Sequence, residues 1–284
     1  MNAEQILAAC AAGRMASSIA LMHLIGATQN EAEFAQHLAQ ARASDAPPLE
    51  ALCALADRNP KCWRLAHAML ATVDHDGAAS IEQLAAMFDD AVALSPAASV
   101  ALYSLGDEAA LDLATQEVVA FMRAAQLLGP EKDVLDLGCG IGRFVRALAP
   151  HVRHVTGLDI SAKMIDEAQR RCADLANVTL RVTSGRDLSG VDDQSVDVVL
   201  AADVFPYLVQ VDIDLAAGHV REASRVLRPG GALLILNFSY RGDMTRDSDD
   251  VRAMAAAAQL TPVDLPASPL VHWDAAAFLQ RKPA

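Results

Sequence analysis

Basic residues and aromatic rings are scarce in this chain of 284 residues, and both shortages bear on the ligands that the protein binds. Lysine and arginine number 23 against 36 aspartates and glutamates, so the formal net charge is −13. Because nucleic-acid binding relies on a basic surface, we expect no nucleic-acid partner. Aromatic residues make up only 4% of the chain, so the few rings near predicted strand ends are informative.

Paired cysteines and long apolar runs are also missing. The five cysteines are odd in number and include no Cys-x-x-Cys pair, which argues against a disulfide framework and a zinc site. The most apolar run, Met15 to Ala27, is too short to span a bilayer. The N-terminus has no basic region ahead of an apolar segment, so we expect no signal peptide. These features predict a soluble, cytoplasmic protein with no membrane partner.

Apolar residues recur at helical spacing through the first 94 residues, which are rich in alanine and leucine. Asn30, Asn59 and Ser80 stand where N-caps are expected. We interpret residues 1–100 as a separate all-α domain that covers the rest of the chain or pairs two subunits in a homodimer. The six predicted helices lie near residues 3–12, 14–26, 30–43, 48–57, 61–72 and 80–94.

One stretch of this region begins like a calcium-binding loop. Asp74-His75-Asp76-Gly77 has the acidic start, but the sixth position is Ala79 and the twelfth is Ala85. A calcium loop needs glycine and glutamate at those positions. We therefore interpret the stretch as an acidic turn and expect no metal site.

Short β-type runs alternate with helical patterns after residue 130. Such alternation is typical of a mostly parallel sheet covered by helices on both faces. The predicted fold class is α/β, with a doubly wound sheet in residues 101–284 beside the helical residues 1–100. Predicted strands lie near 133–137, 154–158, 178–182, 196–201, 231–237, 261–265 and 275–281. Predicted helices lie near 108–127, 142–150, 161–174, 212–227 and 248–258.

A glycine-rich turn follows the first of these strands. From Val134 the sequence reads VLDLGCGIGRF, an apolar run that ends in three glycines at spacing two. Glycine permits positive φ and lets a ligand lie against the backbone. The dinucleotide fingerprint needs a third glycine where Arg143 stands, so a nicotinamide cofactor is disfavoured. Asp159 ends the second strand, where a carboxylate typically binds ribose hydroxyls. Together the loop and the acid indicate an adenosine-bearing ligand.

Four motifs, in this order and spacing, resemble those of class I S-adenosylmethionine-dependent methyltransferases. They are VLDLGCGIGRF from Val134, GLDIS from Gly157, QSVDVV from Gln194 and RVLRPGG from Arg225. The resemblance covers roughly residues 105–284. It implies a seven-stranded Rossmann-like sheet whose reversed edge strand is Ala275–Arg281, S-adenosylmethionine as cofactor, and methyl transfer by direct displacement.

The resemblance also implies where the cofactor lies. The backbone of Gly138 and Gly140 is expected to approach its methionine and ribose parts. Asp136 is expected either to reach the ammonium group or to brace the loop amides. Asp159 is expected to bind the ribose diol, with Ile160 beside the adenine.

The third strand end departs from the family. Ser184 stands where the family often has an aspartate that contacts the adenine amino group. Backbone groups of Gly185 and Arg186 remain candidates to hold the adenine edge. Asp187 either replaces the missing acid or caps a turn, and the cap is our preferred interpretation. Two further expected cofactor contacts, after the fourth strand, are Ala202 and Phe205.

Three tyrosines are candidates for a substrate pocket. Tyr207 and Tyr240 follow the fourth and fifth strands, where aromatic faces suit a sulfonium or an apolar substrate. Tyr103 lies in a region that folds over the cofactor in the family, although packing at a helix junction is an equal alternative. The Asn/Asp-Pro-Pro-Tyr/Phe motif of many amino-methyltransferases is absent. Its absence, with the acidic composition, favours a small-molecule substrate over DNA.

No residue stands out as a catalytic base, and we leave the catalytic residues unassigned. Asp203 and Asp243 follow strands and are candidate proton acceptors. His219 is predicted on the solvated side of a helix. Positioning alone is worth about 7–11 kcal/mol in favourable cases, so a base is not required.

We therefore predict methyl transfer to an O, N or C nucleophile of a small metabolite. A competing hypothesis keeps the cofactor but makes the protein a non-catalytic scaffold or regulator that works through its helical N-terminal domain. The unassigned base and Ser184 motivate that alternative.

Overall fold

A computed structural model describes residues 1–73, 80–265 and 270–284 of the chain. The acidic turn predicted at Asp74-His75-Asp76-Gly77 lies outside these residues. The chain forms two compact units that interleave along the sequence. The first holds Met1–Val73, Asp90–Glu117 and Leu270–Asp274, and the second holds the described residues of Asp74–Asp89, Val118–Pro269 and Ala275–Ala284. The predicted division into functional domains 1–100 and 101–284 stays a prediction.

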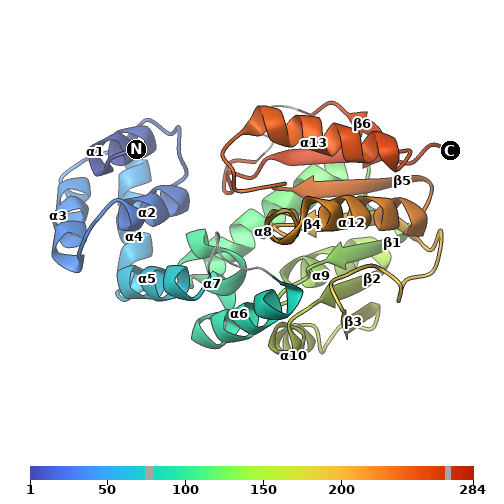
Figure 1. Cartoon of the computed structure of the whole chain (residues 1–284). Coiled ribbons are helices and arrows are strands. Elements are labelled where there is room, and N and C mark those ends of the chain that lie inside the picture. Colours follow the sequence, from blue (N-terminus) through green and yellow to red (C-terminus); the bar gives the residue numbers. More distant parts are fainter. Residues whose placement is uncertain (74–79, 266–269) are drawn as a thin grey trace. The chain divides into compact units, whose positions relative to one another are not determined.

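The first unit is helical, and the six predicted N-terminal helices are confirmed (Figure 1). Asn30 and Ser80 act as the predicted N-caps, accepting hydrogen bonds from the amides of Glu33 and Gln83. The prediction for Asn59 was wrong, because this residue ends a helix and its side-chain amide donates to the carbonyl of Leu105. The helices up to residue 124 are α1 (Ala3–Ala11), α2 (Ser17–Gly26), α3 (Glu31–Arg42), α4 (Pro47–Arg58), α5 (Cys62–Thr72), α6 (Ile81–Leu94), α7 (Pro96–Val100), η1 (Leu102–Ser104) and α8 (Glu108–Ala124). The first part of α6 and the last part of α8 belong to the second unit.

The second unit is built on the predicted seven-stranded sheet, with strand order β3-β2-β1-β4-β5-β7-β6. Strands β1 to β5 are parallel to their neighbours in this order, and β7 runs antiparallel to both β5 and β6. The strands are β1 (Gly129–Leu137), β2 (Val152–Asp159), β3 (Val178–Val182), β4 (Val196–Ala202), β5 (Leu227–Leu236), β6 (Thr261–Val263) and β7 (Ala277–Arg281).

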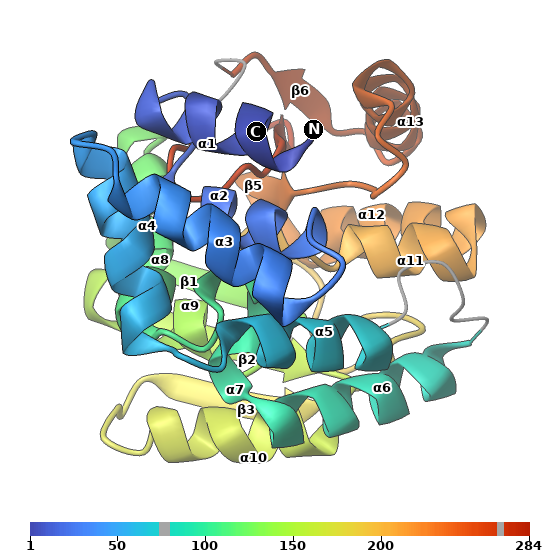
Figure 2. The ribbon, with the colours of Figure 1, turned by 90° about the vertical axis from the view of Figure 1, so that its left-hand side faces the viewer.

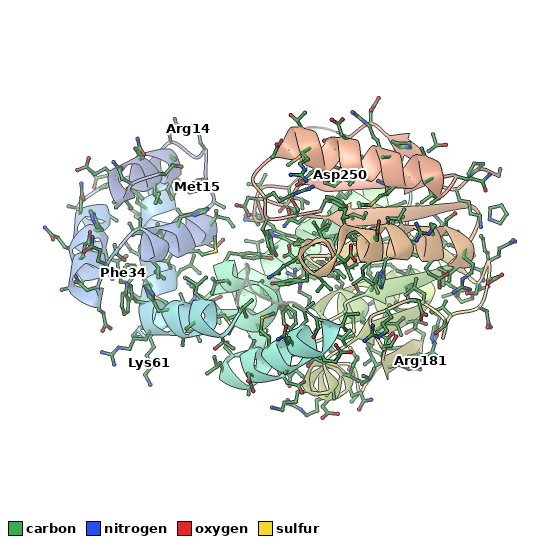
Figure 3. All side chains as sticks on the ribbon, in the orientation of Figure 1. Arg14, Met15, Phe34, Lys61, Arg181 and Asp250 are labelled. Carbon is green, nitrogen blue, oxygen red and sulfur yellow. The ribbon has the colours of Figure 1, made fainter. Side chains whose placement is uncertain are left out.

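The reversed strand is present, but it is not at the edge as expected. Three residues of β6, Thr261–Val263, pair with Leu279–Arg281 and cover the outer side of β7. The sheet edges are therefore β3 and β6. Edge strand β3 is only five residues long and carries the exposed, charged Arg181 (Figure 3), a feature that discourages pairing with other chains.

Helices cover both faces of the sheet. Figure 2 shows α12 and α13 on one side of the strands and α9 on the other. Leu135 and Leu137 of β1 enter the core shared with α12 and α13. Because side chains alternate along a strand, Asp136 between them points toward the opposite face. The helices and turns are α9 (Arg143–Leu148), η2 (Ala149–His151), α10 (Ala162–Arg171), α11 (Phe205–Val211), α12 (Ile213–Val226) and α13 (Met244–Ala257).

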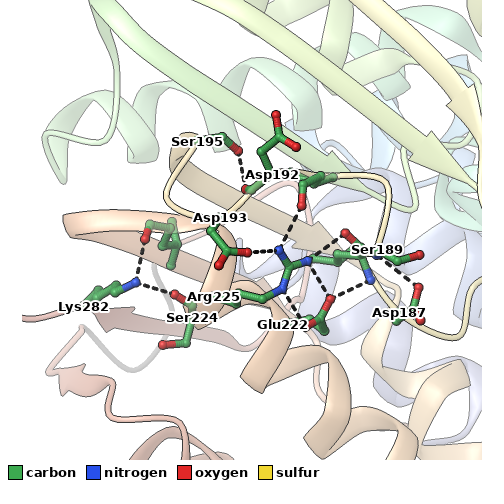
Figure 4. A network of polar contacts seen from close by, with 12 residues as sticks. Asp187, Ser189, Asp192, Asp193, Ser195, Glu222, Ser224, Arg225 and Lys282 are labelled. Carbon is green, nitrogen blue, oxygen red and sulfur yellow. Dashed lines mark hydrogen bonds and ion pairs between the residues drawn. The ribbon is translucent and has the colours of Figure 1, made fainter.

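The first basic residue of the RVLRPGG stretch, Arg225, has an architectural role. Arg225 donates to the carbonyls of Leu188 and Val191 at 2.9 and 3.0 Å, which ties the loop before β4 to α12 (Figure 4). The same guanidinium pairs with Glu222 at 2.7 Å and Asp193 at 2.5 Å, and these carboxylates raise its pKa. These contacts hold the loop and helix that precede β4 and β5.

His219 lies elsewhere than predicted. The sequence placed it on the solvated side of α12, but it is 1% exposed and its Nδ1 lies 3.0 Å from the carbonyl of Leu215. Burial lowers its pKa. The prediction was wrong because His219 stands three residues after Ala216 and four before Ala223, and so lies on the buried stripe of this helix.

All five cysteines are buried free thiols in this structure. No helix within the described ranges is both long and apolar enough to cross a bilayer.

Candidate active site

The candidate site lies at the carboxyl ends of β1, β2, β4 and β5. Strand β1 is flanked by β2 on one side and β4 on the other, so the chain order reverses at this point of the sheet. In open α/β sheets ligands bind at such switch points, outside the carboxyl ends of the strands. The structure brings the glycine loop, Asp136 and Asp159 together here, as the sequence predicted.

The glycine loop needs glycine for conformation and for space. Gly138 and Gly140 have φ values of 68° and 51°, in the left-handed region that other residues rarely adopt. A Cβ on Gly138 would lie 2.2 Å from Cγ2 of Val204. The loop therefore fits closely against the segment that follows β4, and this contact fixes the loop independently of any ligand.

Asp159 braces this loop. Its Oδ2 accepts a hydrogen bond from the amide of Gly140 at 2.8 Å, and its Oδ1 accepts one from the amide of Ser161 at 2.9 Å. Burial raises its pKa to about 6, although these amides oppose the rise. Each carboxylate oxygen can accept more than one hydrogen bond, so the brace leaves acceptor capacity for a ribose diol.

Asp136 is a buried acid without a hydrogen-bond partner. It is 1% exposed, and neither carboxylate oxygen has a partner among the described residues. Burial raises its pKa to about 8 and the negative charge of Asp159 adds to the rise, while Arg143 and the backbone amide of Val145, which lies outside good hydrogen-bond geometry, oppose it. Of the two predicted roles, bracing the loop belongs to Asp159. Asp136 instead supplies an uncompensated acid behind the loop, which suits a cationic ligand.

The N-terminal half of α6 lies against Ile160 and Gly185, which were predicted to contact the adenine, and sequence reasoning missed this neighbour. A Cβ on Gly185 would come within 2.6 Å of Ile160 and 2.9 Å of Ile81, so these three residues meet. The Arg186 guanidinium pairs with Glu82 at 2.6 Å. The helix was predicted, but its spacing of apolar residues says nothing about which strand ends it covers.

Asp89 of α6 extends this contact to the second strand. Its Oδ1 accepts hydrogen bonds from the hydroxyl of Ser161 at 2.5 Å and the amide of Lys163 at 3.1 Å. Ser161 caps α10 in turn. The negative charge of Asp89 contributes to the raised pKa of Asp159. Three carboxylates, those of Asp136 on β1, Asp159 on β2 and Asp89 on α6, therefore belong to this part of the site.

Several predicted site residues have other roles in the structure. Phe205 is fully buried and stacks on Phe238 with ring centroids 5.9 Å apart, so its ring has a packing role, and its cofactor contact stays a prediction. Asp187 accepts from the amide of Ser189 at 3.1 Å and is the turn cap we preferred. Asp243 caps α13 through the amide of Arg246, which accounts for it without a catalytic role.

Tyr103 belongs to the first compact unit. It is 5% exposed, and its ring lies 6.2 Å from that of Trp273 in the same unit. These observations match the packing alternative. Its placement in a substrate pocket stays a prediction.

A connected polar and aromatic cluster follows β4 and β5, where the substrate pocket was predicted. Asp203 follows β4 one residue after Ala202, the predicted cofactor contact at the end of that strand. The Oδ1 atom of Asp203 accepts hydrogen bonds from the side-chain amide of Asn237 at 2.7 Å and the hydroxyl of Tyr240 at 3.0 Å. Tyr240 in turn lies against Tyr207, with ring centroids 5.9 Å apart. The two predicted pocket tyrosines are therefore neighbours.

Comparison with known proteins agrees with this arrangement. Residues 135–235 match the family model described as a methyltransferase domain. The matched segment runs from β1 to β5 and contains the glycine loop and Asp159. The chain contains a class I S-adenosylmethionine-dependent methyltransferase domain.

Relatives of the methyltransferase domain match only part of the chain. A demethylmenaquinone methyltransferase of Tropheryma whipplei (strain Twist) is 36% identical over 119 residues, which are 41% of this chain and 47% of that protein. Phosphoethanolamine N-methyltransferase 1 of Triticum aestivum is 33% identical over 121 residues, covering 40% of this chain and 23% of its own length. The chain thus spans less than half the length of these curated relatives.

A solved structure shows the same fold. The phosphoethanolamine N-methyltransferase 1 of Haemonchus contortus, in complex with phosphoethanolamine and S-adenosylhomocysteine, aligns with a TM-score of 0.54 at 19% identity. The alignment covers 72% of this chain and 48% of that one.

The site of the methyltransferase domain fits S-adenosylmethionine, the cofactor of its family. The cofactor carries two positive groups, a sulfonium and an ammonium, and an adenosine. Asp136 offers a buried acid whose oxygens have no partner in the described part of the chain. Asp159 offers carboxylate oxygens at the end of β2, and Ile160 with Gly185 offers an apolar contact for a base.

Proposed function

We propose that this protein transfers a methyl group from S-adenosylmethionine to a nucleophile of a small molecule. The observation that carries the proposal is the buried, unpartnered Asp136 directly behind a glycine loop that Asp159 braces. A buried acid without a partner is costly to a fold, and a cationic ligand at the same place would remove that cost.

The relatives support a small-molecule acceptor. Their names specify demethylmenaquinone, 2-methyl-6-phytyl-1,4-hydroquinone and phosphoethanolamine, which are all small molecules. These acceptors differ in chemistry, so the relatives favour no particular nucleophilic atom for this chain. The formal charge of −13 also disfavours a nucleic-acid acceptor.

When bound, the cofactor supplies an electrophilic methyl group on a sulfonium. The residues of this chain would then hold that group in line with the acceptor. Gly138 and Gly140 present the backbone, Asp159 holds the ribose, and Asp136 contributes negative charge at the cationic end. Correct positioning alone lowers such barriers by about 7–11 kcal/mol in favourable cases.

Calorimetric titration with S-adenosylmethionine tests the first half of this proposal. We expect saturable binding that is strongly weakened in Asp159→Ala, because the variant loses both the ribose acceptor and the brace on Gly140. Asp249→Asn, on an exposed position of α13, is the matched control and should bind normally. Unchanged affinity in Asp159→Ala would remove that residue from the site.

Turnover tests the second half. Production of S-adenosylhomocysteine with a panel of small metabolites should identify at least one acceptor. Binding without turnover on any acceptor would favour the scaffold hypothesis instead.

We further propose that the helical first unit pairs two copies of the chain. Its surface exposes large apolar side chains, including Leu70 at 42% and Leu113 at 51%. Size-exclusion chromatography with light scattering should then give twice the chain mass at micromolar concentration. A monomer under these conditions would contradict the pairing.

A further inference from the structure

Two adjacent strand ends of the second unit carry the same unusual backbone. Asp203 after β4 and Asn237 after β5 have φ values of 57° and 61°, in the left-handed region. Aspartate and asparagine enter this region more readily than most residues, but the surrounding structure must still hold them there. The amide of Asp203 donates to the carbonyl of Leu236 at 2.9 Å, and the amide of Asn237 donates to the carbonyl of Ala276 at 2.8 Å.

These bonds aim the two side chains at each other. The Oδ1 atom of Asn237 accepts from the amide of Ala276 at 3.0 Å, which orients the side-chain NH2 group toward Asp203. That group donates to Oδ1 of Asp203 at 2.7 Å. The carboxylate of Asp203 is therefore fixed in place at the carboxyl edge of the sheet. Strained and held residues of this kind cluster at functional sites.

Aromatic rings stand beside this carboxylate. The ring of Tyr207 is nearly perpendicular to those of Tyr240 and Phe88, at 85° and 82°, with centroids 5.9 and 5.0 Å away. Tyr240 is 47% exposed, so its ring is accessible to a ligand. In a chain with 4% aromatic residues, three rings from α6, α11 and the loop after β5 meet here.

Two groups that contact the Asp203 carboxylate are neutral. Asn237 and Tyr240 donate hydrogen bonds to it and orient it. Although the side chain of Tyr240 is partly exposed, burial around its hydroxyl and the negative charge of Asp203 raise its pKa, so the phenol stays protonated. Arg241, next to Tyr240, donates to Asp247 at 2.5 Å and Asp250 at 2.7 Å. Its charge is therefore shared with those two acids.

We propose that the methyl acceptor is a primary or secondary amine, which the Asp203 carboxylate and the rings of Tyr207 and Tyr240 bind as an ammonium ion. This proposal rests on the proposed function and specifies its substrate class. Aromatic faces attract cations, and the attraction grows as water is excluded. A carboxylate adds a charge-assisted hydrogen bond with defined direction.

Asp203 also removes the proton that blocks the reaction. One N–H bond of the ammonium breaks, its proton goes to the Asp203 carboxylate, and the electron pair stays on nitrogen. That pair forms the N–CH3 bond while the C–S bond breaks and its electrons return to sulfur. The products are a methylated ammonium and neutral S-adenosylhomocysteine, and Asp203 then releases its proton to water.

Matched acceptor panels test the proposal. Primary and secondary amines, and the alcohols and phenols of the same skeletons, are each incubated with the full-length protein and S-adenosylmethionine, and S-adenosylhomocysteine is measured. We expect turnover with amines. Turnover only with alcohols, phenols or carbon nucleophiles would overturn the amine assignment and leave the proposed function intact. Absence of S-adenosylmethionine binding would instead overturn the proposed function.

Substitutions test the role of Asp203. Asp203→Asn keeps the shape and tolerates the left-handed backbone, and it should lower kcat/KM for amines by about 10²–10⁴-fold. Its rate should also keep rising with pH toward the amine's own pKa, because water must now take the proton. Affinity for S-adenosylmethionine should stay within about twofold of wild type on this reasoning, as it should in the control Asp249→Asn.

The tyrosine variants separate ring from hydroxyl. Tyr240→Phe keeps the ring and should change KM for the amine little, whereas Tyr240→Leu should raise it by roughly 2–30-fold. A pH profile unchanged in Asp203→Asn, or equal KM values in the two Tyr240 variants, would contradict the assignment.

Discussion

Replacing Asp136 by asparagine should stabilise the ligand-free protein and weaken its affinity for the cofactor. Asp136 is 1% exposed and its carboxylate oxygens have no partner in the described residues. Burial raises its pKa to about 8 from the ordinary value of 3.8. The fold therefore disfavours the charged form of this side chain, while a bound cation would favour it.

The sign and size of the stability effect follow from proton linkage. Between about pH 4 and pH 8 the folded protein keeps a proton that the unfolded chain has lost, so unfolding free energy falls as pH rises across that window. At about 1.4 kcal/mol per unit, the loss reaches roughly 5 kcal/mol at pH 8 as an upper limit. An unpaired asparagine amide costs about 1–3 kcal/mol at any pH. Asp136→Asn should thus gain about 2 kcal/mol at pH 8 and little at pH 5.

Cofactor affinity should show the opposite dependence. Suppose that the bound ammonium lowers the pKa of Asp136 by about two units. Affinity for S-adenosylmethionine then rises roughly tenfold from pH 6 to pH 8. This figure already includes the loss of positive charge from part of the cofactor's α-amino groups over the same range. In Asp136→Asn this rise should disappear.

Two measurements on wild type and variant check the reasoning. Chemical denaturation at pH 5 and pH 8 gives the stability difference, and titration with S-adenosylmethionine at pH 6 and pH 8 gives affinity. Parallel pH dependences of affinity in the two proteins would show that Asp136 does not respond to the cofactor. A variant that is less stable at pH 8 would refute the buried, unpartnered state.

Three further substitutions have defined outcomes. Arg225→Met removes the bonds to Leu188 and Val191 and should lower unfolding free energy by about 2–4 kcal/mol in denaturant melts, with cofactor affinity preserved once folded. Gly138→Ala places a methyl group 2.2 Å from Val204, so we expect loss of cofactor binding in titrations; normal binding would show that the loop adapts. If Asp159 braces the glycine loop, Asp159→Ala should make the amide of Gly140 exchange its hydrogen faster. Unchanged protection of this amide would contradict the brace.

The order of helices and strands could be predicted from the sequence because local patterns carry it. Apolar residues at helical spacing fixed α1 to α6, and β-type runs ending in glycine fixed β1. The glycine loop and Asp159 were found for the same reason, since both stand directly after strands in the sequence. α11 was missed because a seven-residue helix beginning at Phe205-Pro206 shows too little periodicity.

One error concerned local structure. His219 was predicted in solvent, although its spacing from Ala216 and Ala223 places it on the buried stripe of α12. The cofactor contact of Phe205 stays a prediction, and its stacking on Phe238 depends on a neighbouring strand end that local sequence does not indicate.

By itself, the sequence determined most of the strands and helices and which acids stand at strand ends. Only the tertiary structure decided how the acids divide their work. Asp159 braces the glycine loop and Asp136 stays without a partner, while Asp203 gains Asn237 and Tyr240. The physical reason is that strand periodicity is local, whereas burial, hydrogen-bond partners and charge depend on which strands and helices become neighbours in space.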